Sequence, residues 1–187
     1  IDIRSFDLPS FRSQLGIVTQ VPFLFAGSVI ENIRYSCPQT SEAEIRAIAH
    51  TIGDGEWVET LPEGLQTEVG ERGARLSMGQ RQLVSLMRVL VQKPAIFILD
   101  EATAFADPDN ESRVQAAFSR LSEGKTVIMI AHRLSTVTNV DQIFVICDGQ
   151  VAECGNSREL LAKDGVFSRM WKNYQTSVQW KVTKEVQ

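Results

Sequence analysis

Two acidic residues, Asp100 and Glu101, directly follow a short apolar run in the segment AIFILDEATA. Such a run predicts a buried strand, and open α/β sheets bind ligands at the carboxyl ends of their strands. Because successive strand residues face opposite ways, the two acids can divide the work. Asp100 would hold Mg²⁺ through water, and Glu101 would orient or deprotonate a hydrolytic water. A strand-end acid pair without a catalytic role is the alternative.

Two other polar residues end predicted strands in the same way. The run TVIMIAH ends in His132, and the run LGIVTQ ends in Gln20. Each has an ordinary explanation, since a single histidine is often structural and a single glutamine is often a surface residue. Asp107, six residues after Glu101, is explained as the N-cap of a helix that has Pro108 at its first position.

The segment LSMGQ precedes an apolar helical pattern that contains Leu83, Leu86 and Leu90. Ser77 and Gln80 have the spacing of a capping box, in which each side chain satisfies a backbone N–H at the helix start. A helix N-terminus also offers N–H donors and a favourable dipole to a phosphate. This segment can therefore cap the helix and also bind an anion.

The elements that must position these residues follow from the hydrophobic pattern. Short runs rich in branched residues predict strands that are buried on both faces. These runs cover residues 15–18, 95–99, 126–131 and 142–147. About 75 residues with helical signals separate the first two, which predicts an inserted helical subdomain. Its helices are expected to start at capping boxes, one of Ser28 with Glu31 and one of Ser41 with Glu44.

The C-terminal region predicts a hairpin followed by helices. Asp148 and Gly149 form a favoured turn pair between two strands, which would add an antiparallel edge to a mostly parallel sheet. Amphipathic helices are expected around 157–162 and 166–174.

Composition limits the function classes. The 187 residues carry a formal charge of −4 and a pI near 5.3, so the chain has no basic field for unassisted binding to nucleic acid. Its three cysteines share no C-x-x-C spacing, which favours free thiols in a reducing compartment. The longest apolar runs are far below the roughly 18 residues of a membrane span, so we expect the chain itself to be soluble.

The order of the motifs resembles that of the ATP-binding-cassette (ABC) ATPase domain over nearly the whole chain. A strand ending in Gln20 is followed by a helical insertion, LSMGQ, LDEATA and IAH. The resemblance implies an α/β fold, namely part of a P-loop NTPase (RecA-like) with a mostly parallel sheet, an inserted α-helical subdomain, and a C-terminal β-hairpin and helices. It also divides this single partial domain into a Q-loop strand region (1–25), a helical subdomain with the signature (26–93) and a C-terminal part (94–187).

The resemblance assigns a role to each polar residue. Asp100 is similar to the Walker B aspartate that holds Mg²⁺, and Glu101 to the catalytic glutamate. Gln20 is similar to the Q-loop glutamine, which contacts Mg²⁺ and nucleotide and couples to a membrane partner. Asp107 is similar to the D-loop aspartate and His132 to the H-loop histidine near the γ-phosphate.

The segment LSMGQ is similar to the family signature, so Ser77, Met78, Gly79 and Gln80 are expected to contact ATP held mainly by a second nucleotide-binding domain. That second domain would come from a homodimer or a heterodimer. The segments FLFAGSVIENI and TEVGERG are similar to those of exporter-type transporters, in which the second touches the transmembrane domain. The resemblance thus implies ATP and Mg²⁺ as cofactors and a location on the cytoplasmic side of a membrane.

Two features depart from the family pattern. The motif G-x-x-x-x-G-K-[ST], which cradles phosphates, does not occur in the chain. Gly124, Lys125 and Thr126 imitate its end but are expected to lead into a strand. Met78 replaces the usual glycine, which would carry a cost if that position needs a positive φ or close approach to phosphate.

The sequence therefore predicts a parent ATPase of exporter type and an isolated chain that does not bind ATP. A non-catalytic interaction fragment is one alternative. A soluble ATPase of the DNA-repair or chromosome type is another, and it would require long coiled-coil heptads in the insertion.

Overall fold

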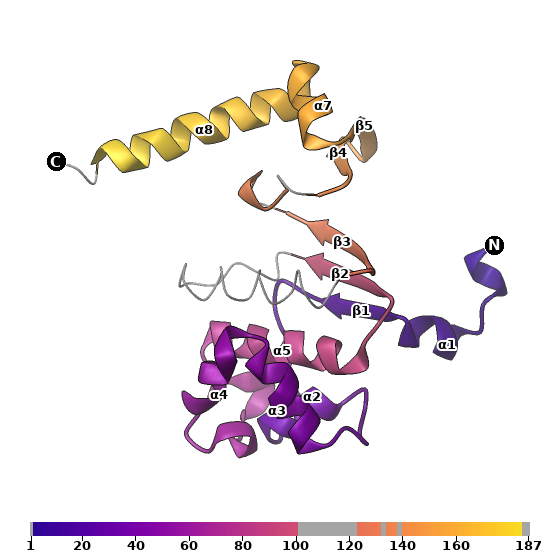
Figure 1. Cartoon of the computed structure of the whole chain (residues 1–187), viewed down its shortest axis with the longest axis vertical. Coiled ribbons are helices and arrows are strands. Elements are labelled where there is room, and N and C mark those ends of the chain that lie inside the picture. The colour runs from indigo at the N-terminus through magenta and orange to yellow at the C-terminus, as the bar shows by residue number, and fades with distance from the viewer. Residues whose placement is uncertain (1, 101–122, 132–133, 138–139, 185–187) are drawn as a thin grey trace. The chain divides into compact units, whose positions relative to one another are not determined.

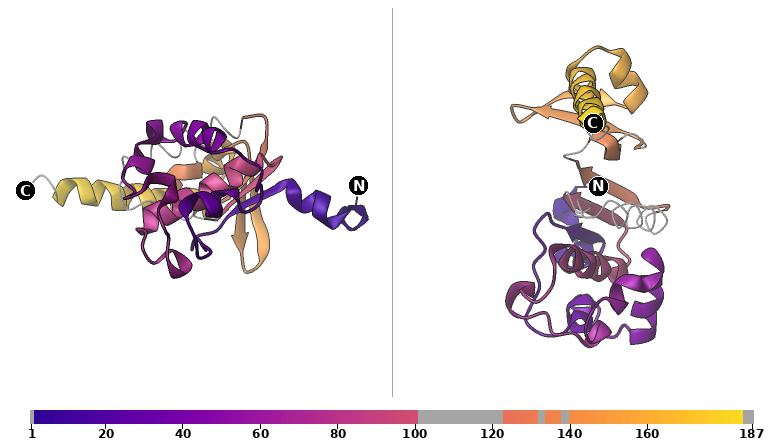
Figure 2. Two further views of the ribbon diagram at one scale, coloured as in Figure 1. Left: turned by 90° about the horizontal axis from the view of Figure 1, so that it is seen from below. Right: turned by 90° about the vertical axis from the view of Figure 1, so that its left-hand side faces the viewer.

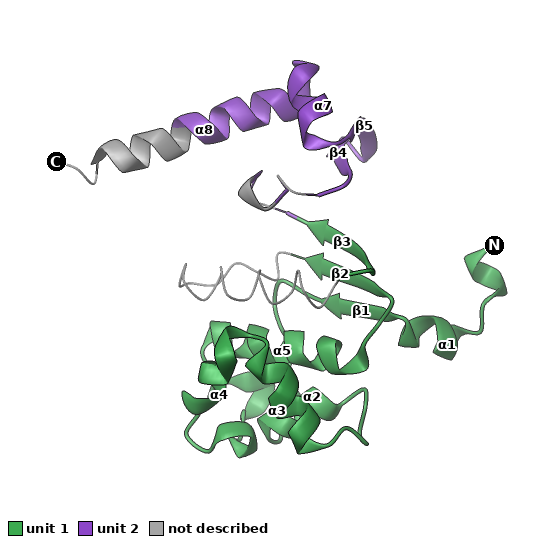
Figure 3. Cartoon of the chain, viewed as in Figure 1, with its two compact units in different colours: residues 1–130 green, residues 131–187 purple. Residues whose placement is uncertain are grey.

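The computed structural model describes residues 2–100, 123–131, 134–137 and 140–184. The chain divides into two compact units, residues 1–130 and 131–187 (Figure 3). None of the helices within the described ranges combines the length and the apolar character that a membrane crossing needs.

Unit 1 contains a three-stranded parallel sheet in the order β1-β2-β3. Its strands are β1 (Leu15–Val18), β2 (Ile96–Asp100) and β3 (Thr126–Ile130). The predicted strands are thus confirmed. Thr126 begins β3, so the triplet from Gly124 to Thr126 leads into a strand, as expected.

The predicted helical insertion between β1 and β2 is also confirmed, and Figures 1 and 2 show it on the β1 side of the sheet. Two elements precede β1, a 3-10 turn η1 (Ile3–Ser5) and helix α1 (Leu8–Ser13). The α-helices of the insertion are α2 (Val29–Arg34), α3 (Glu42–His50), α4 (Glu56–Glu59) and α5 (Met78–Gln92). Its 3-10 turns are η2 (Gly53–Gly55), η3 (Gly64–Gln66) and η4 (Glu71–Gly73).

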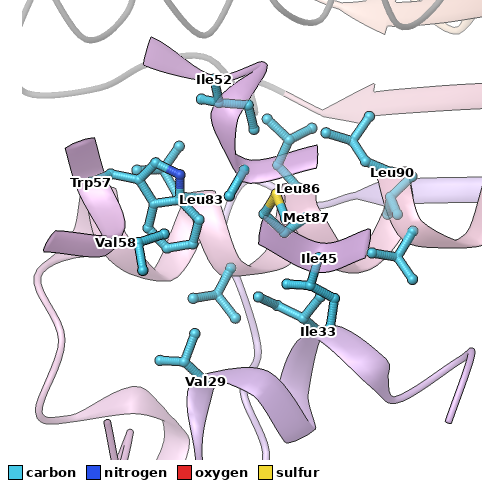
Figure 4. Packing of buried hydrophobic residues seen from close by; sticks show 14 of the residues in the cluster. Val29, Ile33, Ile45, Ile52, Trp57, Val58, Leu83, Leu86, Met87 and Leu90 are labelled. Atoms are coloured by element: carbon cyan, nitrogen blue, oxygen red, sulfur yellow. The ribbon is translucent and has the colours of Figure 1, made fainter. Parts of the chain in front are cut away.

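The capping boxes expected at the starts of α2, α3 and α5 are all present, with both hydrogen bonds formed in each. Each box satisfies two N–H groups that the helix itself cannot satisfy. The helices pack their apolar faces into one core (Figure 4), which includes Ile33 of α2, Ile45 of α3, Trp57 of α4 and Met87 of α5.

Helix α5 joins this core to the sheet. A Cβ atom at Gly16 of β1 would overlap the side chains of Val89 and Pro94, so only glycine allows the close approach. The Gln92 amide donates to the backbone oxygens of Ser13 at 2.9 Å and Leu15 at 3.1 Å. The position of α5 relative to the start of β1 is therefore set by packing and by hydrogen bonds.

The expectation that the strands are buried on both faces is wrong. One face is covered by the helical core, where Val18, Phe97 and Leu99 are at most 1% exposed. On the opposite face Ile17 and Ile128 are 52% and 51% exposed. A continuous apolar run shows that a strand suits burial on both faces, but it does not supply the element that covers the second face.

Unit 2 begins with the 3-10 turn η5 (Leu134–Val137) and continues with the hairpin of β4 (Ile143–Cys147) and β5 (Gln150–Gly155). Asp148 and Gly149 both have positive φ, as the predicted tight turn requires. Within unit 2 the hairpin forms a two-stranded antiparallel sheet. The expected antiparallel edge on the parallel sheet would join the two units and stays a prediction. Helices α7 (Ser157–Ala162) and α8 (Val166–Lys184) follow, and α8 is longer than predicted.

Candidate functional site

The carboxyl edge of the parallel sheet brings together two of the predicted site residues. Val18 lies opposite Leu99 in the register of β1 and β2. Asp100 follows Leu99 on β2, and Gln20 comes two residues after the end of β1, so both reach the same edge. Gln20 is exposed and Asp100 is half-buried.

These two residues suit a magnesium ion that is shared with a nucleotide. Magnesium is usually held by one or two carboxylates together with substrate phosphates and water, rather than by a cage of protein ligands. In the described part of the chain no group of three or more His, Cys, Asp or Glu side chains gathers in a metal-binding arrangement. The Asp100 carboxylate and the Gln20 amide oxygen therefore suit a magnesium ion that is held mainly by phosphates and water. Glu101, Asp107 and His132 lie outside the described residues, and so does the helix predicted after Asp107.

The start of α5 is the second part of the site. The Ser77 hydroxyl accepts from the backbone N–H of Gln80 at 3.2 Å, and the Gln80 side chain accepts from the N–H of Ser77 at 3.0 Å. The N–H groups of Met78 and Gly79 lie in the first turn, where no carbonyl of the same helix can reach them. The capping box thus leaves two backbone donors at the positive end of a helix of 15 residues.

Met78 occupies the first helical position of α5. It is not among the residues with positive φ in the described chain, so the methionine carries no backbone strain there. Its side chain is 48% exposed. The cost of a positive φ at Met78 is therefore absent. The other cost that the sequence predicts, a clash between the methionine side chain and a closely approaching phosphate, stays a prediction.

Residues 77–80 and the two sheet-edge residues lie on different elements of the fold. Ser77 to Gln80 begin α5 within the helical insertion, where the Gln80 side chain donates to the Thr60 hydroxyl at 3.3 Å. Gln20 and Asp100 follow strands.

The two segments that resemble those of exporters are hydrogen-bonded to each other. The N–H of Val29 donates to Thr67 and the N–H of Val69 donates to Gly27, each at 2.9 Å. The Glu31 carboxylate closes the α2 capping box, and the hydrogen bonds from the Ser28 backbone and hydroxyl lower its pKa. FLFAGSVIENI and TEVGERG are therefore adjacent in the structure, although their pairing residues are 40 positions apart in the chain.

An exposed group of rings beyond Gln20 was missed from the sequence. Phe23, Phe25 and Tyr35, which we call the aromatic surface, are 53%, 39% and 58% exposed. Phe25 stacks on Tyr35 with ring centroids 4.3 Å apart and meets the edge of Phe23 at 5.2 Å. No periodic signal links these positions, because the rings come from a loop and from Tyr35, the residue that follows α2.

The family assignment rests on comparisons with known proteins. Residues 1–104 match the family model described as ABC transporter. The ABC transporter ATP-binding protein YknV of Bacillus subtilis is 45% identical over 180 residues, which are 96% of this chain and 30% of the relative. The ABC transporter ATM1 of Toxoplasma gondii is 39% identical over 175 residues, which are 93% of this chain and 16% of the relative.

A solved structure gives the same result at the level of the fold. A bacterial Atm1-family ABC exporter with ATP bound superimposes with a TM-score of 0.86 and 39% identity, covering 92% of this chain and 30% of that chain. The chain therefore spans less than a third of the length of these relatives. Together with the motif order and the parallel sheet with its helical insertion, these matches show that the chain belongs to the ABC transporter family and is an exporter-type nucleotide-binding domain.

Proposed function

We propose that the chain acts as a Mg·ATP-hydrolysing domain that couples nucleotide binding and hydrolysis to substrate movement across a membrane. The observation that carries the proposal is the exposed start of α5, where Ser77 caps the helix and the N–H groups of Met78 and Gly79 have no carbonyl partner within their own helix. This arrangement suits the γ-phosphate of a nucleotide.

The nucleotide would lie between two such domains. The start of α5, from Ser77 to Gln80, would contact ATP that is held mainly by the second domain, in a homodimer or a heterodimer. The sheet edge would serve the nucleotide of its own domain, with Asp100 and Gln20 holding Mg²⁺ as oxygen donors. When bound, the metal would neutralise charge that develops on the phosphates.

Three residues outside the described ranges complete the proposed chemistry. Glu101 orients the attacking water and accepts its proton, and His132 stabilises charge near the γ-phosphate. Asp107 acts at the interface between the two domains as the D-loop aspartate. The transmembrane domain would contact the region formed by FLFAGSVIENI and TEVGERG, and the chain would lie on the cytoplasmic side of the membrane.

Replacement of Glu101 tests this proposal in the complete transporter that carries this sequence. The Glu101→Gln variant is expected to lose about a hundredfold or more of its steady-state ATP turnover, because a general base contributes a factor of this order. ATP binding should persist, since the amide keeps the size of the carboxylate. Glu123→Gln, which changes an exposed glutamate in unit 1, is the control and should keep full turnover. Unchanged hydrolysis in Glu101→Gln would remove Glu101 from this role.

An interaction module that does not bind ATP is the second candidate for the chain by itself. It is favoured by the lack of a G-x-x-x-x-G-K-[ST] segment among the 187 residues. The DNA-repair or chromosome type is disfavoured, because residues 26–93 are all described and their longest helix has 15 residues, too short for a long coiled coil.

A further inference from the structure

Every nitrogen of the Arg88 guanidinium group on α5 donates a hydrogen bond, two of them to Asn32 of α2 and one to Phe23 in the loop before α2. Its Nε donates to the backbone oxygen of Asn32 at 2.9 Å, and its Nη2 donates to the Asn32 side-chain oxygen at 3.0 Å. Its Nη1 donates to the backbone oxygen of Phe23 at 3.1 Å. The nearest acceptor in sequence is 56 residues away, so these bonds are wholly tertiary.

The same group lies against the aromatic surface. The guanidinium carbon of Arg88 is 5.7 Å from the ring centroid of Phe25 and 5.7 Å from that of Tyr35. At these distances a cation is attracted to the faces of aromatic rings. The Arg88 side chain therefore contacts the stacked rings of Phe25 and Tyr35 as well as backbone oxygens of Phe23 and Asn32.

Asn32 extends this network into the loop. It is 2% exposed, its amide nitrogen donates to Phe25 at 2.9 Å and Ser28 at 3.0 Å, and its side-chain oxygen accepts from the N–H of Phe25 at 2.9 Å. Loss of Arg88 would remove one donor from each Asn32 oxygen and one from the Phe23 oxygen, while the N–H groups of Tyr35 and Phe25 would still donate to Asn32. Burial lowers the pKa of Arg88, and its hydrogen-bond acceptors here are uncharged oxygens.

We propose that Arg88 is a positioning residue that makes α5 and the aromatic surface move as one rigid unit. Ser77 and Arg88 stand at opposite ends of the same helix, about 16 Å apart at 1.5 Å per residue. A displacement at the start of α5 is thus transmitted to Phe23, Phe25 and Tyr35 through one guanidinium group. Arginine is required for this because its planar fork reaches three acceptors at fixed angles, whereas a lysine is a single point charge.

Hydrogen exchange in the 187-residue chain, resolved to single amides, tests the positioning role without reference to ATP. Arg88→Met keeps the length of the stem and removes every donor. It should accelerate exchange of the Phe25 amide by about tenfold, while amides in the middle of α5 keep their protection. Arg88→Lys should restore the charge but not the protection of Phe25.

The matched control is Arg46→Met, which removes an exposed arginine of α3 that pairs with Glu42 at 2.7 Å. It should leave exchange at Phe25 unchanged. If Arg88→Met does not fold, Arg88→Lys decides the question, because it keeps the charge and most of the buried stem. Normal protection of Phe25 in a folded Arg88→Lys chain would overturn the proposal.

Arg88 should also affect how strongly transported substrate stimulates ATP turnover. This expectation rests on the proposed function and is tested in the complete transporter. Arg88→Lys should keep the KM for ATP and the basal turnover, while stimulation of turnover by transported substrate falls by about threefold or more. If exchange at Phe25 rises but stimulation stays normal, Arg88 does not couple the two surfaces. If the unmodified transporter shows no ATP turnover at all, the proposed function fails, whereas the exchange result still stands.

Discussion

At the scale of single residues, Ser77 and Ser41 offer a direct comparison. Each is an exposed serine that caps a helix, and each accepts from the N–H three residues later at 3.2 Å. The start of α5 adds Met78 and Gly79 in a segment that resembles the nucleotide-binding signature, and the start of α3 does not. The two serines therefore have the same structural role, and only Ser77 has a proposed chemical one.

Replacing either serine with alanine should lower the free energy of unfolding by a similar amount, about 1 kcal/mol, because one cap is lost in each case. Only Ser77→Ala should also reduce ATP turnover in the complete transporter, by about tenfold, through the loss of a hydroxyl near the phosphate. Urea unfolding and steady-state ATPase assays check the two parts. Equal turnover in both variants would reduce Ser77 to a helix cap.

At the scale of elements, the junction between β5 and α8 depends on one carboxylate. Glu153 accepts the backbone N–H of Phe167 at 3.0 Å and that of Val166 at 2.5 Å, so it caps α8 from another element. A Cβ atom at Gly165 would overlap this carboxylate, so a larger residue there would displace the Glu153 side chain from its position. The two backbone hydrogen bonds, first that from Phe167, lower the pKa of Glu153, and Arg169 and Lys163 lower it further.

The lowered pKa predicts a pH dependence with a definite sign. Because the carboxylate is favoured in the folded state, its contribution to stability is complete above the ordinary glutamate value of 4.5 and is lost as the pH falls through the lower folded value. Glu153→Gln should be less stable than the unmodified chain near neutral pH, and the difference should shrink below pH 4.5. Urea unfolding at several pH values measures this. Asp141→Asn, which removes another exposed carboxylate of unit 2, is the control and should match the stability of the unmodified chain near neutral pH.

At the scale of the whole molecule, the chain carries helix α5, which starts at LSMGQ, and strand β2, which ends in Asp100, but no phosphate-cradling motif occurs in its 187 residues. We expect calorimetric titration of the folded chain with Mg·ATP to show no saturable binding up to about 1 mM, which corresponds to only about −4.1 kcal/mol. Circular dichroism of the same sample is the control for folding. Saturable micromolar binding would mean that phosphate is held without a P-loop, and it would contradict the interpretation of this chain as an incomplete cassette.

The sequence by itself determined the local elements and the order of the motifs. The capping boxes of Ser28, Ser41 and Ser77, the hairpin turn at Asp148 and the strand that ends in Asp100 all depend on residues close together in the chain. Local hydrogen bonds and hydrophobic period encode such elements directly.

Only the tertiary structure decided which of these elements meet. It placed Gln20 and Asp100 at one sheet edge through the register of β1 and β2. It also revealed the contact of Arg88 with Phe25, which joins side chains more than 60 positions apart. The physical reason is that strand registry and cation–π contacts form between distant segments, so neither produces a periodic signal in the sequence.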